Sequence, residues 1–492
     1  MLGLQIAITP ENLLACFIGC LVGTLVGVLP GVGVSGTMAL LLPLTFVLGP
    51  AAGTIMLTGI WYGANYGGST TSILVNVPGE ATSVVTCLDG HKMAKKGRAG
   101  AALAIAAMGS FFAGTVAVLG LSFFAPVLAK AALAFGPPEY FTLALMGLVI
   151  LANLSGKSSQ KSYLMAVFGI MLATVGMDAI SGSARYTLGL SPLFEGVEFV
   201  AVLMGVFGIA EVLRVACTNC DAVPTLIKFR FRDLYPNKEE LHRAAKPVLR
   251  GSVLGFLIGL IPGPAATIAS FASYGLERKL VKPPEGFGEG AVEGVAGPEA
   301  ANNSACGGGM VPLLALGLPF SPPTAVLISG LIMHGVTPGP LLMTQNPEIF
   351  WGVVGSMYVG NVICLILNLP LVGVFASIAR VRPAILMPLV VLICFVGAYG
   401  INNSMFDVWV MIFFGVLGFF MERHGFQPAP LVLWLVLGKM MESSLRRSIV
   451  LFDGNWLGFV DRPISAAFLL VIILVLLLPL ISKKRIGTSS EV

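Results

Sequence analysis

The chain has 492 residues, of which 56% are hydrophobic and only 11% are charged, with a formal net charge of +5. About a quarter of the residues in a soluble globular domain are charged, so this composition excludes that class and predicts an all-α polytopic membrane protein. The basic residues stand mostly in short loops. Their charge therefore indicates membrane orientation, and we expect no nucleic-acid partner.

Apolar runs typical of membrane-spanning helices recur along the whole chain. They lie near residues 12–29, 51–65, 101–128, 139–154, 163–177, 197–217, 248–275, 321–334, 350–378, 384–400, 406–421, 428–441 and 464–482. We therefore expect about 12 transmembrane helices. The first residues lack the basic stretch and the cleavage site of a signal peptide, which predicts that the first apolar segment is retained.

Four segments rich in glycine and proline interrupt this pattern, at residues 27–36, 65–82, 259–268 and 302–324. Proline removes an amide donor, and glycine permits backbone conformations that other residues avoid. Non-helical backbone is tolerated at membrane depth only where it is buried in protein or lines a watery cavity. Each segment is therefore predicted to be a re-entrant hairpin or a broken helix, with a kinked or tightly packed helix as the alternative.

The interrupted segments form two matching pairs. Residues 23–31 (GTLVGVLPG) match residues 255–263 (GFLIGLIPG) at an offset of 232, and residues 67–82 align with residues 308–324 at an offset of 241. Two matching blocks in the same order predict an internal duplication. The expected organisation is a first repeat at 1–220, a basic cytoplasmic linker at 221–250, a second repeat at 251–445, and a final transmembrane helix with a cytoplasmic tail at 446–492.

Loop charge predicts that the two repeats have inverted topology, because Lys and Arg collect in short cytoplasmic loops. Residues 1–26, before the first interrupted segment, contain no Lys or Arg, whereas residues 228–250, before its counterpart, carry several. The relation reverses after the second block, where residues 92–98 are basic and residues 334–348 contain no Lys or Arg. With the basic loops inside, the N-terminus is periplasmic and the C-terminus is cytoplasmic. Inverted repeats with broken helices at a central binding site are a known construction of secondary transporters.

The interrupted segments supply backbone, hydroxyl and amide groups as candidate ligands. The candidate substrate-binding residues of the first half are Pro30, Gly31, Gly33, Ser35, Gly67, Gly68, Ser69, Thr70, Thr71, Ser72, Asn76, Pro78 and Gly79. Those of the second half are Pro262, Gly263, Pro264, Asn302, Asn303, Ser304, Gly308, Gly309, Pro319, Ser321 and Thr324. Helix N-termini at the breaks can hold an anion, and freed carbonyls suit a cation such as Na⁺.

Three residues are candidates for binding a coupling ion, Na⁺ or H⁺, namely Asn76, Glu80 and Asn303. An interfacial carboxylate is the alternative role of Glu80. We expect no cofactor and no structural metal, because the CxxC pair of Cys217 and Cys220 has no second pair nearby, and a structural zinc site needs four ligands.

Four stretches resemble the large membrane subunit of the tripartite tricarboxylate transporters, the TctA family. They are LVGVLPGVGVSGTMALLLPLTF, YGGSTTSILVNVPGEATSVVTCLDGHKMAKKGRAGAALAIAAMGSFFAGT, GLIPGPAATIASFASYGLERK and NNSACGGGMVPLLALGLPFSPPTAVLISG. The resemblance implies a bacterial inner-membrane permease that imports a small di- or tricarboxylate such as citrate, driven by an ion gradient without ATP. It also implies two partners, a small TctB-like membrane subunit and a periplasmic TctC-like solute-binding protein. On this analogy the site lies in Pro30–Ser35, Ser69–Glu80, Pro262–Thr267 and Asn302–Thr324.

Two other functions stay open from the residues alone. The first is a stand-alone secondary carboxylate carrier without a binding protein. The second, more remote, is an intramembrane serine protease, because Ser35 stands in a GVSG sequence. That chemistry needs a histidine base within reach of the serine. We place His91, His242 and His424 in loops and His334 at a helix end, so we expect no enzyme. The absence of a GxxxxGK[ST] motif from the sequence argues against a primary pump.

Overall fold

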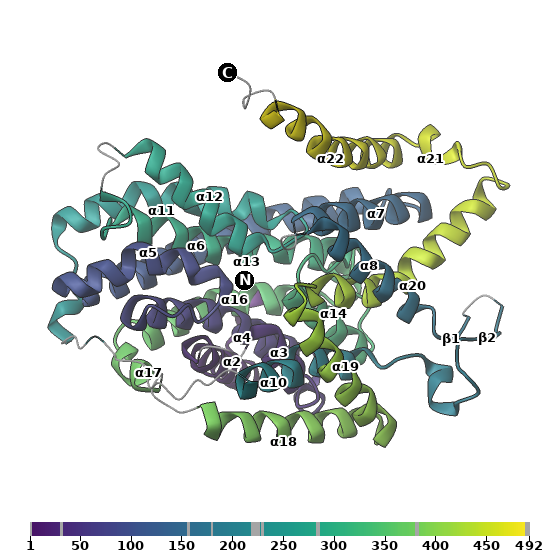
Figure 1. Ribbon diagram of the computed structural model, residues 1–492, viewed down its shortest axis with the longest axis horizontal. Coiled ribbons are helices and arrows are strands. Elements are labelled where there is room, and N and C mark those ends of the chain that lie inside the picture. Colours follow the sequence, from purple (N-terminus) through teal and green to yellow (C-terminus); the bar gives the residue numbers. More distant parts are fainter. Residues whose placement is uncertain are drawn as a thin grey trace.

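The computed structural model describes residues 2–29, 33–154, 158–178, 181–217, 227, 231–281, 286–378 and 383–487. Nearly every element is a helix (Figure 1). The strands β1 (Gly176–Met177) and β2 (Ala184–Arg185) form a short antiparallel pair in which Gly176 lies opposite Arg185. Together with the apolar helices described below, this confirms the prediction of an all-α polytopic membrane protein.

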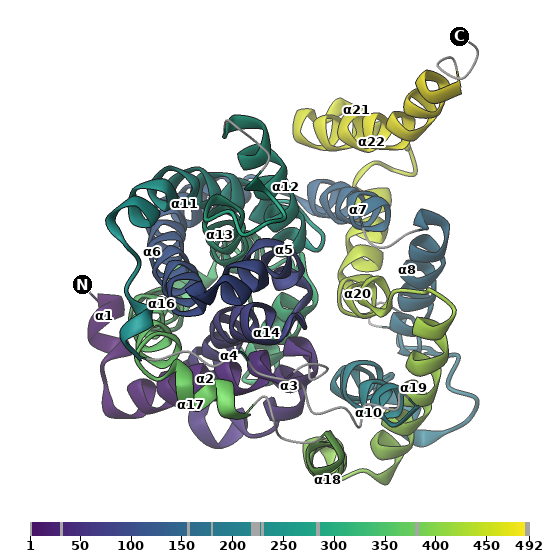
Figure 2. The same cartoon turned by 60° about the vertical axis from the view of Figure 1, so that its left-hand side comes forward.

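The helices form two groups that are visible side by side in Figure 2. The core bundle consists of α1 (Leu2–Ala7), α2 (Pro10–Val28), α3 (Val34–Leu41), α4 (Thr45–Val75), α5 (Val84–Met93), α6 (Ala99–Ala132), α11 (Lys238–Gly259), α12 (Ala265–Leu280), α13 (Glu293–Leu316), α14 (Pro322–Met333), α15 (Leu342–Gln345), α16 (Pro347–Asn368) and α17 (Val372–Ile378). The flanking bundle consists of α7 (Pro137–Leu154), α8 (Ser159–Ala173), α9 (Phe199–Leu203), α10 (Ala210–Cys217), α18 (Pro383–Asn402), α19 (Met405–Arg423), α20 (Pro428–Leu451), α21 (Gly458–Asp461) and α22 (Pro463–Gly487). Each bundle therefore takes one continuous stretch from each half of the chain.

Among the described residues, seven helices are long and apolar enough to span a membrane. This number is smaller than the number of apolar runs because several runs fold as short or divided helices. The run at 248–275 contains α11 and α12, and the run at 350–378 contains α16 and α17. The run at 321–334 is the 12-residue helix α14. Chain breaks within apolar runs are thus one reason for the smaller number of long helices among the described residues.

Helix α13 was not predicted from hydropathy, although it lies at the centre of the core bundle. All 24 of its residues are buried, and it packs against α6, α11, α12 and α5. Its first half carries glutamate, asparagine, serine and glycine, so it does not form an apolar run. A helix surrounded by protein can carry polar side chains, because neighbouring helices supply their hydrogen-bond partners. The hydropathy of α13 therefore reflects its protein surroundings.

Glycines let the backbones of two helix pairs touch within the core bundle. A methyl group on any of these glycines would collide with a backbone carbonyl oxygen of the facing helix. On α2 and α4 the facing pairs are Gly19 with Met56, Gly23 with Ile60, and Gly27 with Ala64. On α11 and α13 they are Gly251 with Gly297, Gly255 with Ala301, and Gly259 with Ala305. The glycines differ by the offset of 232 and their partners by 241, so equivalent positions make equivalent contacts.

Candidate functional site

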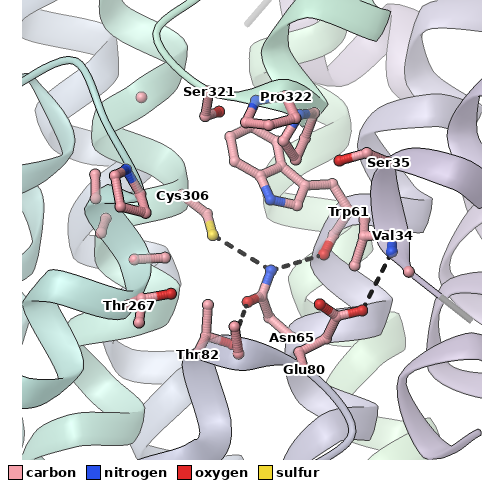
Figure 3. Close-up of a pocket in the computed structure, with 18 of the residues that line it drawn as sticks. Val34, Ser35, Trp61, Asn65, Glu80, Thr82, Thr267, Cys306, Ser321 and Pro322 are labelled. Atoms are coloured by element: carbon pink, nitrogen blue, oxygen red, sulfur yellow. Dashed lines mark hydrogen bonds between the residues drawn. The ribbon is translucent and has the colours of Figure 1, made fainter. Parts of the chain in front are cut away.

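Four helix beginnings meet at the wall of one cavity of about 340 Å³ (Figure 3). Helices α3, α12 and α14 begin there, and so does the 3₁₀ turn Ala81–Ser83 that leads into α5. The first amides of a helix have no partner within it, and the dipole is positive at this end, so each beginning favours an anion. Pro322 and Pro323 have no amide hydrogen, so the beginning of α14 has two fewer amide donors. At this helix the dipole still favours an anion. The volume suits a small ligand.

The turns that precede two of these helices are built alike. Asn76 caps the end of α4 with φ of 61°, and Gly317 caps the end of α13 with φ of 70°, both in the left-handed conformation. The next helical segments then begin with similar caps. The Glu80 amide donates to Ser83 Oγ at 3.4 Å. The Ser321 amide donates to Thr324 Oγ1 at 2.9 Å. These residues are related by the offset of 241, so the same backbone turn occurs on both sides of the cavity.

Asn65 of α4 forms the polar centre of the cavity wall (Figure 3). Its Nδ2 donates to the Trp61 carbonyl oxygen at 2.9 Å and contacts Cys306 Sγ at 3.3 Å. Its Oδ1 accepts a hydrogen bond of 3.1 Å from Thr82 Oγ1. Asn65 is buried. Its side chain therefore ties α4 to α13 and to the turn that begins α5.

Glu80 places a carboxylate at the beginning of α3. The Val34 amide donates to Glu80 Oε1 at 3.2 Å (Figure 3). A carboxylate at a helix N-terminus is stabilised by the unpaired amides and by the dipole. Glu80 therefore occupies one of the anion-attracting helix ends of the cavity.

The cavity wall combines both bundles. Glu211 of α10 and Glu422 of α19 line it from the flanking bundle, together with Val206 and Phe207 of the π-helical segment Met204–Ile209, which joins α9 to α10. The described lining residues include no Lys or Arg, and the three charged ones are Glu80, Glu211 and Glu422. Arg214, one turn further along α10, donates to Glu211 at 2.7 Å. An anion in this cavity is thus attracted by helix ends while facing acidic side chains.

A second polar cluster lies in the core bundle around Glu299 of α13. Glu299 is fully buried, and its Oε2 accepts hydrogen bonds from Ser69 Oγ at 2.6 Å and from Asn302 Nδ2 at 3.4 Å. Its Oε1 accepts a hydrogen bond from Thr86 Oγ1. Among the ion pairs of the described residues, none includes Glu299. The carboxylate therefore has neutral hydrogen-bond donors as its described partners.

Asn303 extends this cluster on the side of α6. Its Nδ2 donates to Ser110 Oγ at 2.8 Å and to Asn302 Oδ1 at 2.6 Å. Its Oδ1 is buried without a hydrogen-bond partner. A buried polar atom without a partner is uncommon in a folded protein. Asn303 is thus linked to Glu299 through Asn302, and its Oδ1 is a buried oxygen without a partner.

Comparison with known proteins identifies the family. A family model described as "Tripartite tricarboxylate transporter TctA family" matches residues 13–433. The chain belongs to this TctA family. An uncharacterized 52.8 kDa protein in the TAR-I ttuC' 3' region of Agrobacterium vitis is 47% identical over 487 residues, which cover 98% of this chain and 97% of the relative. An uncharacterized protein in the TAR-II ttuC' 3' region of the same organism is 44% identical over 234 residues, which cover 47% of this chain and 97% of the relative. No solved structure matches the chain.

The predicted site residues of this TctA-family chain fall into four groups. Those that line the cavity are Gly33, Ser35, Glu80, Gly263, Pro264, Gly309 and Ser321. Those that lie within α4, α13 or α14 without lining it are Gly67, Gly68, Ser69, Thr70, Thr71, Ser72, Asn302, Asn303, Ser304, Gly308 and Thr324. Those in the turns, again without lining it, are Asn76, Pro78, Gly79, Pro262 and Pro319. Pro30 and Gly31 lie outside the described residues.

Helices α4 and α13 continue through much of the segments that were expected to be broken. The non-helical turns lie at residues 76–80 and 317–321. Hydroxyls within α4 bond to carbonyls of their own helix, as Ser72 Oγ does with the Gly68 oxygen at 2.9 Å. Gly79 lies in the turn at residues 76–80, next to the end of α2, and a methyl group there would collide with the Gly27 carbonyl oxygen. Glycine in these segments thus serves helix contacts as well as chain breaks.

Sequence reasoning missed the polar residues that make the main cross-helix contacts of the TctA-family chain. Thr86, Asp89 and Glu299 lie outside the predicted segments. Asn65, Thr82 and Cys306 lie inside them but were not named as candidate ligands. Asp89 is fully buried and accepts hydrogen bonds at its Oδ1 from the amides of Gly288, Gly290 and Ala291 at 2.7–2.9 Å. It thereby fixes the beginning of α13 against α5. The sequence signal that could have identified Glu299 is an acidic residue within a glycine-containing segment. Acidic groups at membrane depth are candidate functional residues by default.

The cavity offers Ser35 no catalytic base among its described lining residues, which include no histidine. His334 Nε2 contacts Thr45 Oγ1 at 3.3 Å, and His91 Nδ1 contacts the Ile73 carbonyl oxygen at 3.0 Å. The geometry therefore gives no support to a serine protease. Cys220 of the CxxC pair lies outside the described residues.

Proposed function

We propose that this chain is the large permease subunit of an ion-coupled transporter that imports a small di- or tricarboxylate. Membership of the TctA family makes it a tricarboxylate transporter subunit. The observation that carries the finer proposal is the cavity where four helix beginnings meet without a described basic side chain. Helix N-termini bind carboxylates through amides and the dipole, and broken helices at a central site are typical of secondary transporters.

The proposed architecture is a pair of inverted repeats, with a periplasmic N-terminus and a cytoplasmic C-terminus in the bacterial inner membrane. Its support is the agreement of backbone features at the two sequence offsets. Equivalent glycines contact equivalent carbonyls, and Asn76 and Gly317 adopt the same left-handed turn. The opposite loop charges of the two halves support inversion.

The proposed transport step is a movement of the core bundle against the flanking bundle. Its support is the position of the cavity, whose wall combines Glu80 and Ser321 of the core bundle with Phe207 and Glu422 of the flanking bundle. A relative shift of the two bundles opens such a cavity to one side of the membrane and closes it to the other. The substrate reaches it from a periplasmic solute-binding protein, and a small membrane subunit completes the assembly.

Uptake of labelled citrate and other small di- and tricarboxylates into proteoliposomes tests this function. We expect uptake to require an imposed Na⁺ or proton gradient and the cognate binding protein. Uptake that is undiminished without a gradient, or that ATP alone drives, contradicts ion coupling. Full uptake without the binding protein supports a stand-alone carrier instead. Absence of uptake of every carboxylate by the complete assembly refutes the proposal.

A further inference from the structure

The Glu299 cluster has the composition of a cation site that is distinct from the carboxylate cavity. Glu299 is fully buried in α13. Two other buried carboxylates of this chain face arginine: Glu277 pairs with Arg250 at 2.5 Å, and Glu139 pairs with Arg462 at 2.7 Å. The buried carboxylate of Asp89 instead accepts hydrogen bonds from three backbone amides. Burying a charge is costly unless an opposite charge or a metal compensates it. Glu299 has two hydroxyls and an amide as its described partners, so its negative charge is left without such compensation.

The oxygen atoms of the Glu299 cluster suit a hard cation such as Na⁺. A serine or threonine hydroxyl that donates to a carboxylate also has lone pairs, which it can turn toward an ion. Ser69 and Thr86 therefore add two hydroxyl oxygens to the two carboxylate oxygens of Glu299. Hard cations prefer oxygen ligands from several groups. A proton needs one acceptor, so the convergence of several groups favours a metal cation.

Asn303, which is joined to the cluster through Asn302, has a side-chain oxygen without a partner. Asn303 is buried, and its Nδ2 is held by Ser110 Oγ and Asn302 Oδ1. Its Oδ1 has no hydrogen-bond partner. Each unsatisfied buried group in a native structure calls for a ligand or a structural reason. Asn303 therefore adds an unpartnered buried oxygen to the polar network that includes Glu299.

We propose that Glu299, Ser69 and Thr86, supported by Asn302 and Asn303, bind one Na⁺ beside the carboxylate cavity. This assignment rests on the proposed function, because it locates the coupling ion of that transporter. The cluster lies on the helical elements that carry the cavity's polar groups. Ser69 follows Asn65 by four residues, Thr86 follows Thr82 by four, and Asn302 precedes Cys306 by four. Four residues make about one helical turn, or roughly 5 Å along the axis.

Such a short separation links the two sites. Ser69 Oγ also lies 3.4 Å from the carbonyl oxygen of Asn65, the residue at the polar centre of the cavity. An ion that holds Ser69 and Thr86 against Glu299 also restrains the neighbouring helical turns, which carry Asn65 and Thr82. It also places a positive charge behind a wall whose described charged residues are acidic. Both effects favour a carboxylate in the cavity when the cation is bound.

The repeat relation between the two halves does not reproduce this cluster. At the offset of 241, Glu299 corresponds to Thr58, Ser69 to Met310, and Thr86 to Leu327. The side chains at these equivalent positions provide neither a carboxylate nor two hydroxyls. The inference is therefore one Na⁺ at this cluster, without a second copy in the other half.

Thermal unfolding of the purified full chain in detergent tests the site without any carboxylate. The chain is titrated with NaCl, with KCl and choline chloride as references at constant ionic strength. We expect Na⁺ to raise the melting temperature in a saturable way that K⁺ does not reproduce, because Na⁺ binds only the folded chain. Glu299→Gln should lose this shift. A wild-type chain without a Na⁺-specific shift, or one stabilised only by acid pH, overturns the assignment.

Variants of Thr86 keep the test decisive if Glu299→Gln fails to fold. Thr86→Val removes the hydroxyl at nearly constant volume and should raise the half-saturating Na⁺ concentration about tenfold or more, whereas Thr86→Ser should restore it. The matched control is Thr58→Val, which removes a buried hydroxyl that bonds to the Thr54 carbonyl of its own helix at 2.8 Å. The control should keep the wild-type Na⁺ response. A Thr86→Val variant that responds like Thr58→Val contradicts the site.

The outcomes separate this inference from the proposed function. A chain that shows the Glu299-dependent Na⁺ shift, while its complete assembly takes up no carboxylate, supports the cation site and refutes the transport proposal. A chain that transports a carboxylate without a Na⁺ shift refutes the cation site and leaves the transport proposal standing.

Discussion

The backbone contacts within the two helix pairs allow a quantitative test of the proposed repeat. Gly23 on α2 and Gly255 on α11 are equivalent at the offset of 232. A Cβ atom at Gly23 would lie 2.8 Å from the carbonyl carbon and the Cα of Ile60. A Cβ atom at Gly255 would lie 2.8 Å from the same two atoms of Ala301. The perturbation is Gly→Ala at each site, which adds one methyl group to each helix contact.

The expected loss of stability follows from these distances. Carbon atoms pack best at about 3.5–4.0 Å, so each helix pair must separate locally by about 1 Å to admit the methyl group. The obstructing atoms are backbone and cannot move aside by changing rotamer. Overpacking of this kind costs about 1–3 kcal/mol in a well-packed core. Because their surroundings match, Gly23→Ala and Gly255→Ala should both lower the free energy of unfolding within this range.

Gly275→Ala on α12 is the matched control, because a Cβ atom there would meet nothing within 4 Å. Alanine favours a helix over glycine by up to about 1 kcal/mol, so this variant should be as stable as the wild type or more stable. The assay is thermal unfolding of the three purified variants in one detergent, followed by circular dichroism. If Gly23→Ala and Gly255→Ala melt at the temperature of Gly275→Ala, the close-contact reasoning fails. If only one of them is destabilised, the equivalence of the two halves is refuted.

Two further predictions concern charge burial and the cavity. Arg250→Met should lower the free energy of unfolding by about 3–5 kcal/mol, because it leaves the carboxylate of Glu277 buried without its partner. The double variant with Glu277→Gln should recover most of this loss in the same unfolding assay, and no recovery would show that Arg250 acts through packing instead. Asn65→Leu keeps a similar volume and removes the hydrogen bonds to Thr82 and Trp61. This variant should reduce carboxylate uptake about tenfold or more with little change in melting temperature. A tenfold loss corresponds to about 1.4 kcal/mol, which one or two polar contacts at a binding site can contribute. Wild-type uptake would contradict the role of Asn65.

The sequence allowed the class of fold and the places of the chain breaks to be predicted, because both depend on local properties. Apolar runs such as 12–29 and 101–128 correspond to the helices α2 and α6. Proline and glycine marked the regions of the turns. Helix α13 escaped prediction because hydropathy reports suitability for lipid, whereas α13 is buried in protein along its whole length.

The side chains that face the cavity were harder to predict than the breaks themselves. Segment 65–82 was expected to be broken, yet most of it continues as α4. The helical period places Asn65 and Ser69 on one face, where Asn65 lines the cavity and Ser69 meets Glu299 one turn further along. Glu299 meets Thr86 across 213 residues of sequence. No local pattern encodes such a contact, because it depends on how α4, α5 and α13 pack together.

The similarity of the two halves lies in the backbone and does not extend to the side chains. Position 80 carries glutamate where position 321 carries serine, and Asn65 is matched by Cys306. Both halves contribute helix ends that attract an anion without regard to its shape. The first half alone adds the Asn65 amide and the Glu80 carboxylate, so an asymmetric carboxylate should bind in one orientation. In the proposed transporter a substrate anion shares the cavity with Glu80, and a cation or a proton that enters with the substrate reduces the repulsion between them. Ion coupling is therefore the expected consequence of placing an acidic side chain in an anion site.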